Sequence, residues 1–526
     1  MADLAGFLAV ANAIFRSVFT VSHVAGWSLS GWARRPVGRY SRGVQATLKL
    51  RRPQAPIRAV LRPPGSKSIS NRALLFAAMA DGMSEILGCL DADDTRLMLG
   101  CLRELGLAVT QLGDPLSDGL RVTGVGQRLG NRAELPTLQV GTAGTVARFL
   151  TAALATARQP PWGSVQVDGS ARMRERPMAT LLEALRELGA QFECHGGEGA
   201  LPFTVRPPAD GALGGSVTLS RPVSSQFVSA LVIAGCACSA GLDIVLEQGT
   251  PARPYVDMTL RVLGAFGGSA AWLPTDELPE GASSTTEIIR VESRNLRPCT
   301  RYIVEPDASA ASYLLALPVL YGGEVTVPDL GSESLQGDAQ FWRVLEAFGG
   351  RGEQDESRTV MRGPDTPGQL RGQELDLTDM PDMTLTAAVV AAFATGPTRI
   401  RGVGILRHHE SDRIAAGATE LRKLGAKVEE HEDGLDIEPP TPEALRERLD
   451  AGVVIDTYED HRMAMAFALA GDVTIADPGC VAKTFPRYFE VLDSVGMLPE
   501  PEPEPEPTPD VEAAEAAEPT EDADTE

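Results

Sequence analysis

Six stretches of small and apolar residues recur at near-regular intervals along the chain. Their first residues lie 76, 82, 83, 75 and 78 positions apart and are Ser66, Thr142, Ser224, Asp307, Asp382 and Asp460. Apolar residues occupy most of the circumference of each predicted helix, a pattern typical of helices that are buried on all sides. Each stretch opens with Ser, Thr or Asp, which are favoured N-cap residues. The pattern therefore predicts six buried helices with polar caps.

A second series, Leu-x-x-x-Gly, alternates with the first. It occurs in steps of 83, 75, 85, 76 and 71 residues, at 102–106, 185–189, 260–264, 345–349, 421–425 and 492–496. Each match resembles the last turn of an amphipathic helix that ends at a glycine. Strand-like runs follow at 107–112 and 426–431. The predicted repeat unit is one buried helix, one amphipathic helix and intervening strands, about 78 residues in all and present six times.

The starts of the buried helices favour anion binding. The first N–H groups of a helix have no partner within it, and an anionic ligand satisfies them well. Cations stand near three of these starts: Lys67 and Arg72 at the first, Arg148 after the second and Arg462 in the sixth. Helix capping alone explains the Ser, Thr and Asp residues but not these cations. If the helix starts converge, the sequence predicts a positively polarised basin.

Composition limits the class of protein. A chain of 526 residues is longer than one compact core usually supports, so two or more domains are expected. The net charge of −23 argues against a nucleic-acid binder. Seven cysteines without a CxxC pair indicate reduced thiols in a cytoplasmic protein, and they favour neither a structural zinc site nor a disulfide scaffold.

The two ends differ from the rest of the chain. Residues 499–526 contain twelve acids and no Lys or Arg. Alternating Pro and Glu cannot bury enough apolar area to offset chain entropy, so a disordered acidic tail is expected. Residues 1–50 are predicted to be a poorly ordered extension, in which Arg16 and His23 interrupt the apolar part and argue against a membrane-spanning helix. The apolar stretch is not preceded by the basic leader that a secretory signal has, so such a signal is not expected. A dispensable extension or an overcalled start is favoured over an organelle transit peptide.

Two basic motifs offer anion-binding groups. PPGSKSISNR (63–72) is not a Walker A loop, because Leu61 stands where its first glycine is required, so a nucleoside triphosphatase is excluded. Its Gly-Ser-Lys-Ser turn still presents an ammonium, hydroxyls and N–H donors to an oxyanion. DGSARMRERPM (168–178) places arginines at 172, 174 and 176. Three arginines on one face of a strand are costly, so a solvated loop is favoured there.

HHESDR (408–413) brings Glu410 and Arg413 close together beside two histidines. With His461 these side chains have the chemistry of metal ligands, but adjacent residues rarely share a helical face. Neither a metal nor a cofactor is expected.

Eight motifs follow one another along the chain: PGSKSISNR, GTAGT, DGSARMRERP, SSQFVSAL, RPYVDMTL, ESDR, DHRMAMAFAL and AKTFP. In this order they closely resemble the 5-enolpyruvylshikimate-3-phosphate synthase family of enolpyruvyl transferases, from about residue 51 to 498. The resemblance implies an α/β (α+β) fold of two similar domains. Each domain has three βαβαββ units around buried helices (an inside-out α/β barrel), and the active site lies in the interdomain cleft. The implied domains are 63–303 and 51–62 plus 304–498.

The resemblance also implies a reaction, in which the enolpyruvyl group of phosphoenolpyruvate is transferred to the 5-hydroxyl of shikimate 3-phosphate by addition and elimination. This is a step of chorismate and aromatic amino acid biosynthesis. Asp382 is the implied base, Glu410 the implied acid, and Lys67 shares the proton transfer. The implied ligands of phosphoenolpyruvate are Lys67, Gly144, Thr145, Arg172, Arg413, Arg462 and Lys483. Those of shikimate 3-phosphate are Lys67, Ser68, Arg72, Ser224, Ser225, Gln226, Tyr255, Asp382 and His409.

The sequence departs from the family pattern at four positions. His409 stands where many members have Lys, Ala252 where Ser is often seen, and both Ile405 and Thr142 where Asn is common. These changes affect the expected binding of shikimate 3-phosphate and, since histidine titrates near neutrality, the pH profile. Gly144 is retained, which predicts sensitivity to glyphosate, a herbicide that mimics phosphoenolpyruvate.

Three alternative functions remain open. The nearest is a UDP-N-acetylglucosamine enolpyruvyl transferase, but that enzyme typically has a catalytic Cys in the loop corresponding to 168–178, and this loop has none. The acidic composition disfavours an RNA 3′-phosphate cyclase, and the retained Lys67, Asp382 and Glu410 disfavour an inactive homologue. The expected partners are the two small-molecule substrates, without nucleic acid or membrane, and a cytoplasmic monomer is expected.

Overall fold

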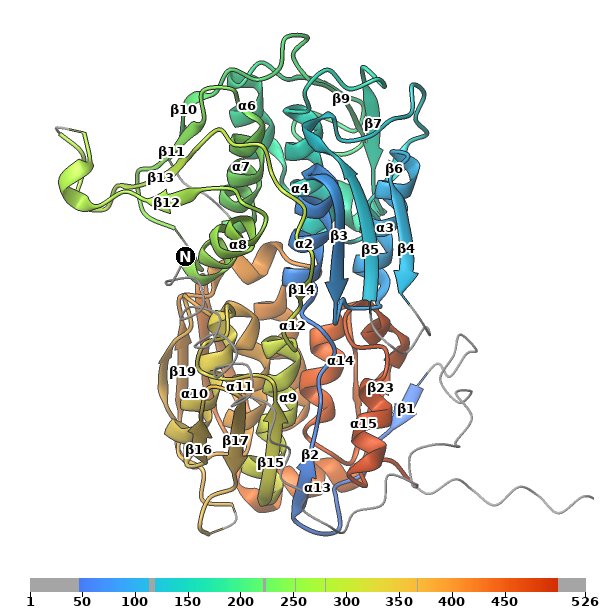
Figure 1. Cartoon of the computed structure of the whole chain (residues 1–526). Helices are drawn as coiled ribbons and strands as arrows, with labels where there is room; N and C mark the ends of the chain where they lie inside the picture. Colours follow the sequence, from blue (N-terminus) through green and yellow to red (C-terminus); the bar gives the residue numbers. More distant parts are fainter. Residues whose placement is uncertain are drawn as a thin grey trace, which may run out of the picture. The chain divides into compact units, whose positions relative to one another are not determined.

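The computed structural model describes residues 47–499, except 113–118, 221–223, 251, 280 and 367. Most of the predicted extension 1–50 and nearly all of the predicted tail 499–526 therefore lie outside the described residues. Helices and strands alternate along the chain (Figure 1), and the strands pair into five four-stranded sheets and one three-stranded sheet. None of these sheets closes on itself into a barrel. Within the described ranges, no helix is both long and apolar enough to cross a bilayer.

Five sheets share one strand order, in which the fourth strand lies between the second and the third. The first two strands are parallel and the remaining pairs are antiparallel. Three of these sheets use consecutive strands: β6 (Leu138–Gln139), β7 (Val165–Asp168), β8 (Gln191–Cys194) and β9 (Phe203–Arg206); β10 (Gly215–Leu219), β11 (Leu242–Leu246), β12 (Ala270–Trp272) and β13 (Glu287–Val291); β18 (Glu374–Asp376), β19 (Thr398–Arg401), β20 (Lys427–His431) and β21 (Gly434–Glu438). The predicted βαβαββ repeat is therefore confirmed.

Two sheets take their first strand from a distant part of the chain. The strands of one are β14 (Tyr302–Ile303), β3 (Asp81–Leu87), β4 (Ala108–Leu112) and β5 (Gly119–Val125); those of the other are β2 (Ile57–Val60), β15 (Gly323–Pro328), β16 (Arg351–Gln354) and β17 (Arg358–Arg362). β14 pairs in parallel with β3, and β2 pairs in parallel with β15. The chain thus leaves one group of sheets after β2 and returns to it after β14.

The sixth sheet completes the series in a shortened form. Its strands are β1 (Thr47–Lys49), β22 (Val453–Ile455) and β23 (Val473–Ala476). β22 and β23 are parallel, and β1 pairs with β23 in the antiparallel direction. An N-terminal strand therefore takes the place that the fourth strand has in the other sheets.

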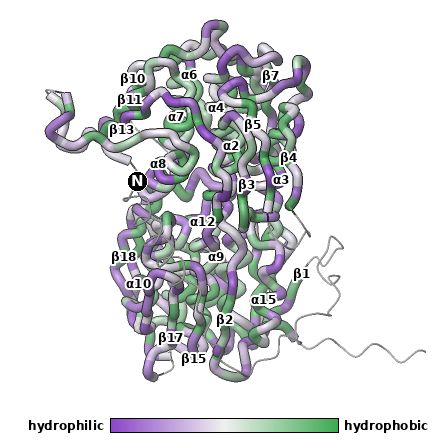
Figure 2. The backbone as a smooth tube through the Cα atoms, in the orientation of Figure 1, coloured by the Kyte–Doolittle hydropathy of each residue, from purple (hydrophilic) through white to green (hydrophobic). Residues whose placement is uncertain are grey.

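The six predicted buried helices are present. They are α2 (Lys67–Met79), α4 (Gly144–Ala155), α7 (Ser225–Ala237), α9 (Ala308–Tyr321), α11 (Thr384–Ala392) and α14 (His461–Ala468). Every residue of α4, α11 and α14 is buried. The hydropathy along these helices can be followed in Figure 2. Such helices bury apolar surface around their whole circumference and so form the centre of each half of the molecule.

Each buried helix is accompanied by a more amphipathic one. These are α3 (Asp93–Glu104), α6 (Ala179–Glu187), α8 (Arg253–Ala265), α10 (Phe341–Phe348), α12 (Arg413–Lys423) and α15 (Tyr488–Ser494). Five end as predicted, because Gly106, Gly189, Gly349, Gly425 and Gly496 have positive φ angles. The match at 260–264 was wrong as a helix end. α8 continues through Gly264 to Ala265, and the left-handed residue is Gly267.

The buried apolar residues fall into two separate cores. One contains residues between Ile69 and Val304, which we call the first half. The other joins Leu48, Leu50, Ile57 and Leu61 to residues between Ala308 and Leu498, which we call the second half. The last residues of the predicted extension 1–50 thus belong to the second half, since Leu48 and Leu50 are buried there and β1 pairs with β23. Their backbone hydrogen bonds and apolar side chains are satisfied only by that packing.

This placement makes Leu50 a stability determinant. Its side chain is 1% exposed, and its N–H donates to the carbonyl of Val473 over 2.8 Å. We expect Leu50→Ala to lower the free energy of unfolding by about 2–5 kcal/mol, because it opens a cavity in a packed core. The matched control is Val60→Ala, whose side chain is 64% exposed and whose effect should stay within about 0.5 kcal/mol. Urea unfolding measures both, and equal effects would contradict the assignment.

Candidate active site

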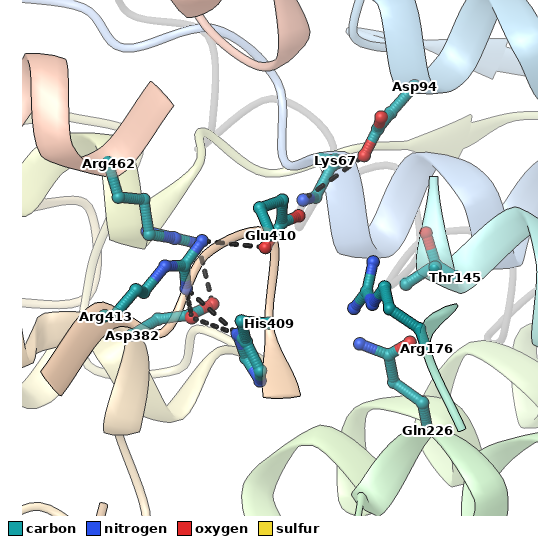
Figure 3. Close-up of a pocket in the computed structure, with 11 residues that line it drawn as sticks. Lys67, Asp94, Thr145, Arg176, Gln226, Asp382, His409, Glu410, Arg413 and Arg462 are labelled. Atoms are coloured by element: carbon teal, nitrogen blue, oxygen red, sulfur yellow. Dashed lines mark hydrogen bonds and ion pairs between the residues drawn. The ribbon is translucent and has the colours of Figure 1, made fainter. Parts of the chain in front are cut away.

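The first turns of six helices meet around one cavity between the two halves. The starts of α2, α3, α4, α7, α12 and α14 all contribute residues to it, and Figure 3 shows how the labelled lining side chains lie. The lining residues are Lys67, Asp94, Gly144, Thr145, Arg176, Gln226, Asp382, His409, Glu410, Arg413 and Arg462. Helix starts carry partial positive charge and free N–H donors, so their convergence favours an anionic ligand.

Four of the six buried helices are capped by the predicted side chain: Ser66, Ser224, Asp307 and Asp460. The predicted caps Thr142 and Asp382 do not cap. Their helices, α4 and α11, begin two residues later and have no side-chain cap. Both side chains bind cations instead, because Lys483 Nζ donates to Thr142 Oγ1 over 2.8 Å and Arg462 donates to Asp382 Oδ2 over 2.6 Å.

Arg413 is the centre of the charged cluster. Its side chain is 2% exposed and donates to Asp460 over 2.7 Å, to Asp382 over 2.9 Å and to Glu410 over 2.9 Å. A buried guanidinium is costly unless carboxylates pair with it in good geometry. Burial lowers the pKa of Arg413, but Asp460, Glu410 and Asp382 outweigh burial and raise it, so the group stays charged.

Two of the three carboxylates that line the cavity, Asp382 and Glu410, are held in the ionised form. Burial raises the pKa of Asp382, but Arg462 and Arg413 lower it by a larger amount. The pKa of Asp382 therefore lies below the usual value of an aspartic acid. Burial likewise raises the pKa of Glu410, and Arg413, Lys483 and Arg176 bring it well below its usual value. Both groups are therefore proton acceptors as the cluster stands.

His409 is neutral in this cluster. Its Nδ1 lies 3.0 Å from an Arg413 N–H, and a guanidinium can only donate, so Nδ1 accepts. Burial and Arg413 lower the pKa of His409 to about 3. The expectation that His409 titrates near neutrality was therefore wrong, because its ring is buried beside a permanent cation.

Two cations reach across from one half to the other. Arg172 of the first half donates to the backbone carbonyls of Glu410 over 2.9 Å and His409 over 3.2 Å. Lys483 of the second half donates to the carbonyl and hydroxyl of Thr142 over 3.1 and 2.8 Å. The free volume inside the cavity is about 30 Å³, which is room for about one water molecule. The cavity as it stands is therefore smaller than a ligand with several charged groups.

Three comparisons identify relatives. The family model for EPSP synthase (3-phosphoshikimate 1-carboxyvinyltransferase) matches residues 51–492. The chain belongs to the EPSP synthase family. It is 39% identical over 487 residues to the chloroplastic 3-phosphoshikimate 1-carboxyvinyltransferase of Brassica napus, covering 90% of each chain. It is 41% identical over 448 residues to the enzyme of that name from Cellvibrio japonicus, covering 84% of this chain and 98% of the relative.

Solved structures show the same fold. An EPSP synthase from Acinetobacter baumannii superposes with a TM-score of 0.66 at 24% identity, over 85% of this chain and 98% of that one. The enolpyruvyl transferase NikO from Streptomyces tendae gives a TM-score of 0.63 at 17% identity, over 86% and 98%. The expected α/β architecture of enolpyruvyl transferases is thereby confirmed.

The structure brings most of the residues implied by the EPSP synthase motifs to the cavity. Nine of them line it: Lys67, Gly144, Thr145, Gln226, Asp382, His409, Glu410, Arg413 and Arg462. Arg172, Lys483 and Tyr255 contact lining residues from behind or beside them. Ser68, Arg72, Ser224 and Ser225 do not line the cavity but lie at or near the starts of α2 and α7.

Arg72 has a structural role in addition to its expected one. It is 1% exposed and donates to Thr259 Oγ1 over 2.7 Å and to the carbonyls of Ser68 and Tyr255 over 2.9 Å each. Burial lowers its pKa to about 10. The guanidinium of Arg72 therefore connects the start of α2 to α8. It can bind a ligand only through an N–H group that is not used in these hydrogen bonds.

Sequence reasoning missed two residues that line the cavity, Asp94 and Arg176. Arg176 was noted only as one of three arginines in a loop favoured to be solvated. The segment instead contains a short helix, α5 (Ala171–Glu175), capped by Ser170. The helix sends the three arginines in different directions, since Arg174 pairs with Asp168 over 2.6 Å while Arg176 is 5% exposed. For Asp94 the available signal was its position in the first turn of a helix that follows the Lys67 helix.

Only one group of potential metal ligands has its atoms close together in the described residues. Glu429, His431 and Asp436 of the β20–β21 hairpin have ligand atoms within 4.8 Å of one another. Asp436 already pairs with Arg401 over 2.6 Å and with Arg399 over 3.6 Å. Two guanidinium groups on the same carboxylate disfavour a metal ion at this position.

A further carboxyl group lies behind Asp382. Asp338 is 4% exposed, accepts from Tyr255 Oη over 2.9 Å and is hydrogen-bonded to Ser309. Burial and the nearby charge of Asp382 raise the pKa of Asp338 to about 7, against the effects of Ser309 and Arg462. Asp338 therefore keeps its proton to a higher pH than an ordinary aspartic acid does.

The raised pKa of Asp338 predicts the direction in which the stability of the protein changes with pH. An acid whose pKa is higher in the folded state stabilises it at low pH, and that stabilisation is lost as the pH rises through the folded pKa. In Asp338→Asn this loss disappears. We expect the stability of the variant relative to wild type to rise by about 1–4 kcal/mol between pH 4 and pH 8. Urea unfolding across this range measures it. The control is Asp329→Asn, with a side chain 69% exposed, and a pH dependence in Asp338→Asn that parallels wild type would refute the assignment.

Proposed function

We propose that this protein transfers the enolpyruvyl group of phosphoenolpyruvate to the 5-hydroxyl of shikimate 3-phosphate and releases inorganic phosphate. The observation that carries the proposal is the buried cluster in which Asp382 and Glu410 share Arg413, at the meeting point of six helix starts. Such a cluster offers an acid–base pair and several fixed cations for two phosphorylated acids. Membership of the EPSP synthase family supports the same reaction.

The reaction has two steps with a tetrahedral intermediate. In the first, the substrate hydroxyl oxygen bonds to carbon 2 of phosphoenolpyruvate, Asp382 takes the hydroxyl proton, and Glu410 or Lys67 delivers a proton to the methylene carbon. In the second, the bond from carbon 2 to the phosphate oxygen breaks, the methyl group returns one proton to the group that supplied it as the double bond re-forms, and the departing phosphate takes the proton held by Asp382. The distances from Arg413 to Asp382 and Glu410 are both 2.9 Å, which fixes the acid and the base relative to each other.

The cations of the cluster prepare this chemistry. The proposed ligands of phosphoenolpyruvate are Lys67, Gly144, Thr145, Arg172, Arg413, Arg462 and Lys483. Arg413 and Lys483 now hold the pKa of Glu410 well below its usual value. A phosphate and a carboxylate bound to the same cations would neutralise part of that charge, so the pKa of Glu410 rises towards the range in which it can donate a proton.

Shikimate 3-phosphate is proposed to bind on the side of Gln226 and Tyr255. Its proposed ligands are Lys67, Ser68, Arg72, Ser224, Ser225, Gln226, Tyr255, Asp382 and His409. Arg148 donates to Gln226 Oε1 over 2.7 Å and thereby orients its amide. Since His409 is neutral and accepts at Nδ1, it offers this substrate an Nε2–H donor in place of the ammonium expected from the family pattern.

The organisation of the chain follows from the two cores. We propose that 63–303 and 51–62 plus 304–498 are two domains that close on the substrates, with a monomer as the working unit. All seven cysteines are free in the structure, which supports the proposed cytoplasmic location, since reduced thiols persist there. The retained Gly144 supports glyphosate sensitivity.

A phosphate-release assay tests the reaction directly. We expect turnover with phosphoenolpyruvate plus shikimate 3-phosphate, and none when UDP-N-acetylglucosamine replaces shikimate 3-phosphate. The α5 segment that faces the cavity, residues 168–178, has no cysteine, which disfavours the nucleotide-sugar reaction. Turnover with the nucleotide sugar alone would favour the alternative transferase, and no phosphate release with either acceptor would favour an inactive homologue.

Glu410→Gln tests the proposed acid. The amide keeps the size of the side chain but cannot donate or accept the proton in transfer, so we expect kcat to fall by about 10²–10⁴-fold. Substrate binding by fluorescence or calorimetry should remain measurable. The control is Glu432→Gln on the exposed surface, which should leave kcat unchanged. A kcat for Glu410→Gln within twofold of wild type would remove Glu410 from the mechanism.

A further inference from the structure

We propose that Asp94 is a positioning residue that holds the ammonium groups of Lys67 and Lys483 side by side for phosphoenolpyruvate. Asp94 carries none of the roles assigned above. The inference rests on the proposed function of the two lysines as ligands of this substrate. A Lys483 variant distinguishes failure of this inference from failure of the proposed function.

One carboxylate contacts both ammonium groups. Asp94 Oδ2 lies 3.4 Å from Lys67 Nζ, and Asp94 Oδ1 lies 3.2 Å from Lys483 Nζ. The side chains of Asp94, Lys67 and Lys483 are 3%, 14% and 8% exposed. Figure 3 shows Asp94 directed at Lys67, on the opposite side of the lysine from Arg413 and His409. Since Lys67 begins α2 and Lys483 ends the 3₁₀ turn Pro478–Lys483, Asp94 joins groups from both halves.

The carboxylate of Asp94 reduces the repulsion between the two ammonium groups. Two ammonium groups that approach one anion must lie close together, and at low dielectric their mutual repulsion is large. A single carboxylate between them cancels one of the two charges and leaves one net positive charge for the ligand. An ammonium has three N–H donors, so the bond of Lys67 to Asp94 leaves donors for a phosphate or carboxylate. Lys483 also donates to the carbonyl and the hydroxyl of Thr142, and a ligand of Lys483 would replace one of these two acceptors.

Asp94 is itself held firmly. It is the second residue of α3, where a carboxylate interacts favourably with the helix dipole. The next residue, Thr95, donates to the carbonyl of Leu90 over 2.7 Å and accepts from the N–H of Ala92 over 3.2 Å. Asp93 stands in the same turn but is directed to solvent, with a side chain 50% exposed and 3.5 Å from Arg96. The two neighbouring acids therefore share the first turn of α3 but differ in their surroundings.

The charge of Lys483 depends on the groups that face it. These are Asp94 from α3, Glu410 from the segment before α12, Arg176 after α5, and Thr142 before α4. Burial lowers the pKa of Lys483, Asp94 and Glu410 raise it, Arg176 lowers it, and the result is raised. Removal of the Asp94 charge would therefore lower this pKa, and the lysine would lose its proton at lower pH.

The test compares Asp94→Asn with Asp93→Asn. For Asp94→Asn we expect the KM for phosphoenolpyruvate to rise about tenfold or more, as for loss of a charged hydrogen bond, while kcat changes less. The high-pH limb of kcat/KM should move to lower pH. Asp93→Asn should keep both the KM and the pH profile of wild type, because it removes an acid from the same helix turn without touching either lysine. Thermal unfolding establishes that each variant is folded.

Asp94→Glu supplies a second variant. It keeps the charge and displaces it by one methylene, so we expect a smaller rise in KM and an unmoved high-pH limb. An unchanged KM in Asp94→Asn would overturn the proposal, and so would a lower KM, which would mean that Asp94 competes with the substrate for the lysines. If Asp94→Asn does not fold, an unchanged KM in Asp94→Glu overturns it.

Lys483→Met separates this inference from the proposed function. If Lys483→Met raises the KM for phosphoenolpyruvate while Asp94→Asn does not, only the role of Asp94 fails. If Lys483→Met leaves that KM unchanged, the lysine is not a ligand and both proposals fail at this residue.

Discussion

The buried guanidinium of Arg413 is the interaction on which the site depends. It is 2% exposed and bonds to three carboxylates from three different segments, at Asp382, Glu410 and Asp460. A charge at this depth is tolerated only if its partners surround it, and each partner is tolerated only because of the charge. The positions of the proposed base and acid therefore follow from one side chain. Asp460 has no proposed chemical role, yet it is 0% exposed and caps α14, so it links the cluster to the helix that carries Arg462.

The repeat explains how such a cluster can be built. Four of the six buried helices, α2, α4, α7 and α14, begin at the cavity, and Asp382 stands two residues before a fifth, α11, so the two cores bring these starts together. Burial removes the helix starts from water, so their N–H groups and the cations beside them need anions. Protein carboxylates fill this need in part, through Asp94, Asp382 and Glu410. On the proposed function, a phosphorylated acid would replace these carboxylates as the partner of cations that the fold already holds in place, which lowers the cost of ordering them.

The regular parts of this fold could be predicted from the sequence, and the exceptions have physical causes. Helix periodicity and glycine-ended turns depend on local residues, so the six buried helices and five of six helix ends were found. Thr142 and Asp382 were wrongly expected to cap because a capping side chain and a side chain that binds Lys483 or Arg462 look alike in sequence. β1 was missed because its partner, β23, lies more than 400 residues away.

Some residues of the candidate site could likewise be predicted from the sequence, and others could not. Residues in recognisable motifs, such as Lys67 and Arg413, could be assigned to the site from the sequence alone. Asp94 could not, since its role comes from two contacts with residues 27 and 389 positions away in the chain. His409 shows the opposite error, because its residue type suggested titration near neutrality and only the buried contact with Arg413 shows that the ring stays neutral.

The acidity of the whole chain and the cationic character of its site are compatible because they act over different distances. Surface charges separated from the cavity by more than about 8 Å are largely screened at physiological salt. Inside the cavity the nearest charges dominate, and four of the charged lining residues are cations (Lys67, Arg176, Arg413 and Arg462) while three are carboxylates (Asp94, Asp382 and Glu410). Arg172 and Lys483 add two more cations at its edge. The net charge of −23 therefore favours solubility, whereas the local excess of buried cations decides which ligands the site can hold.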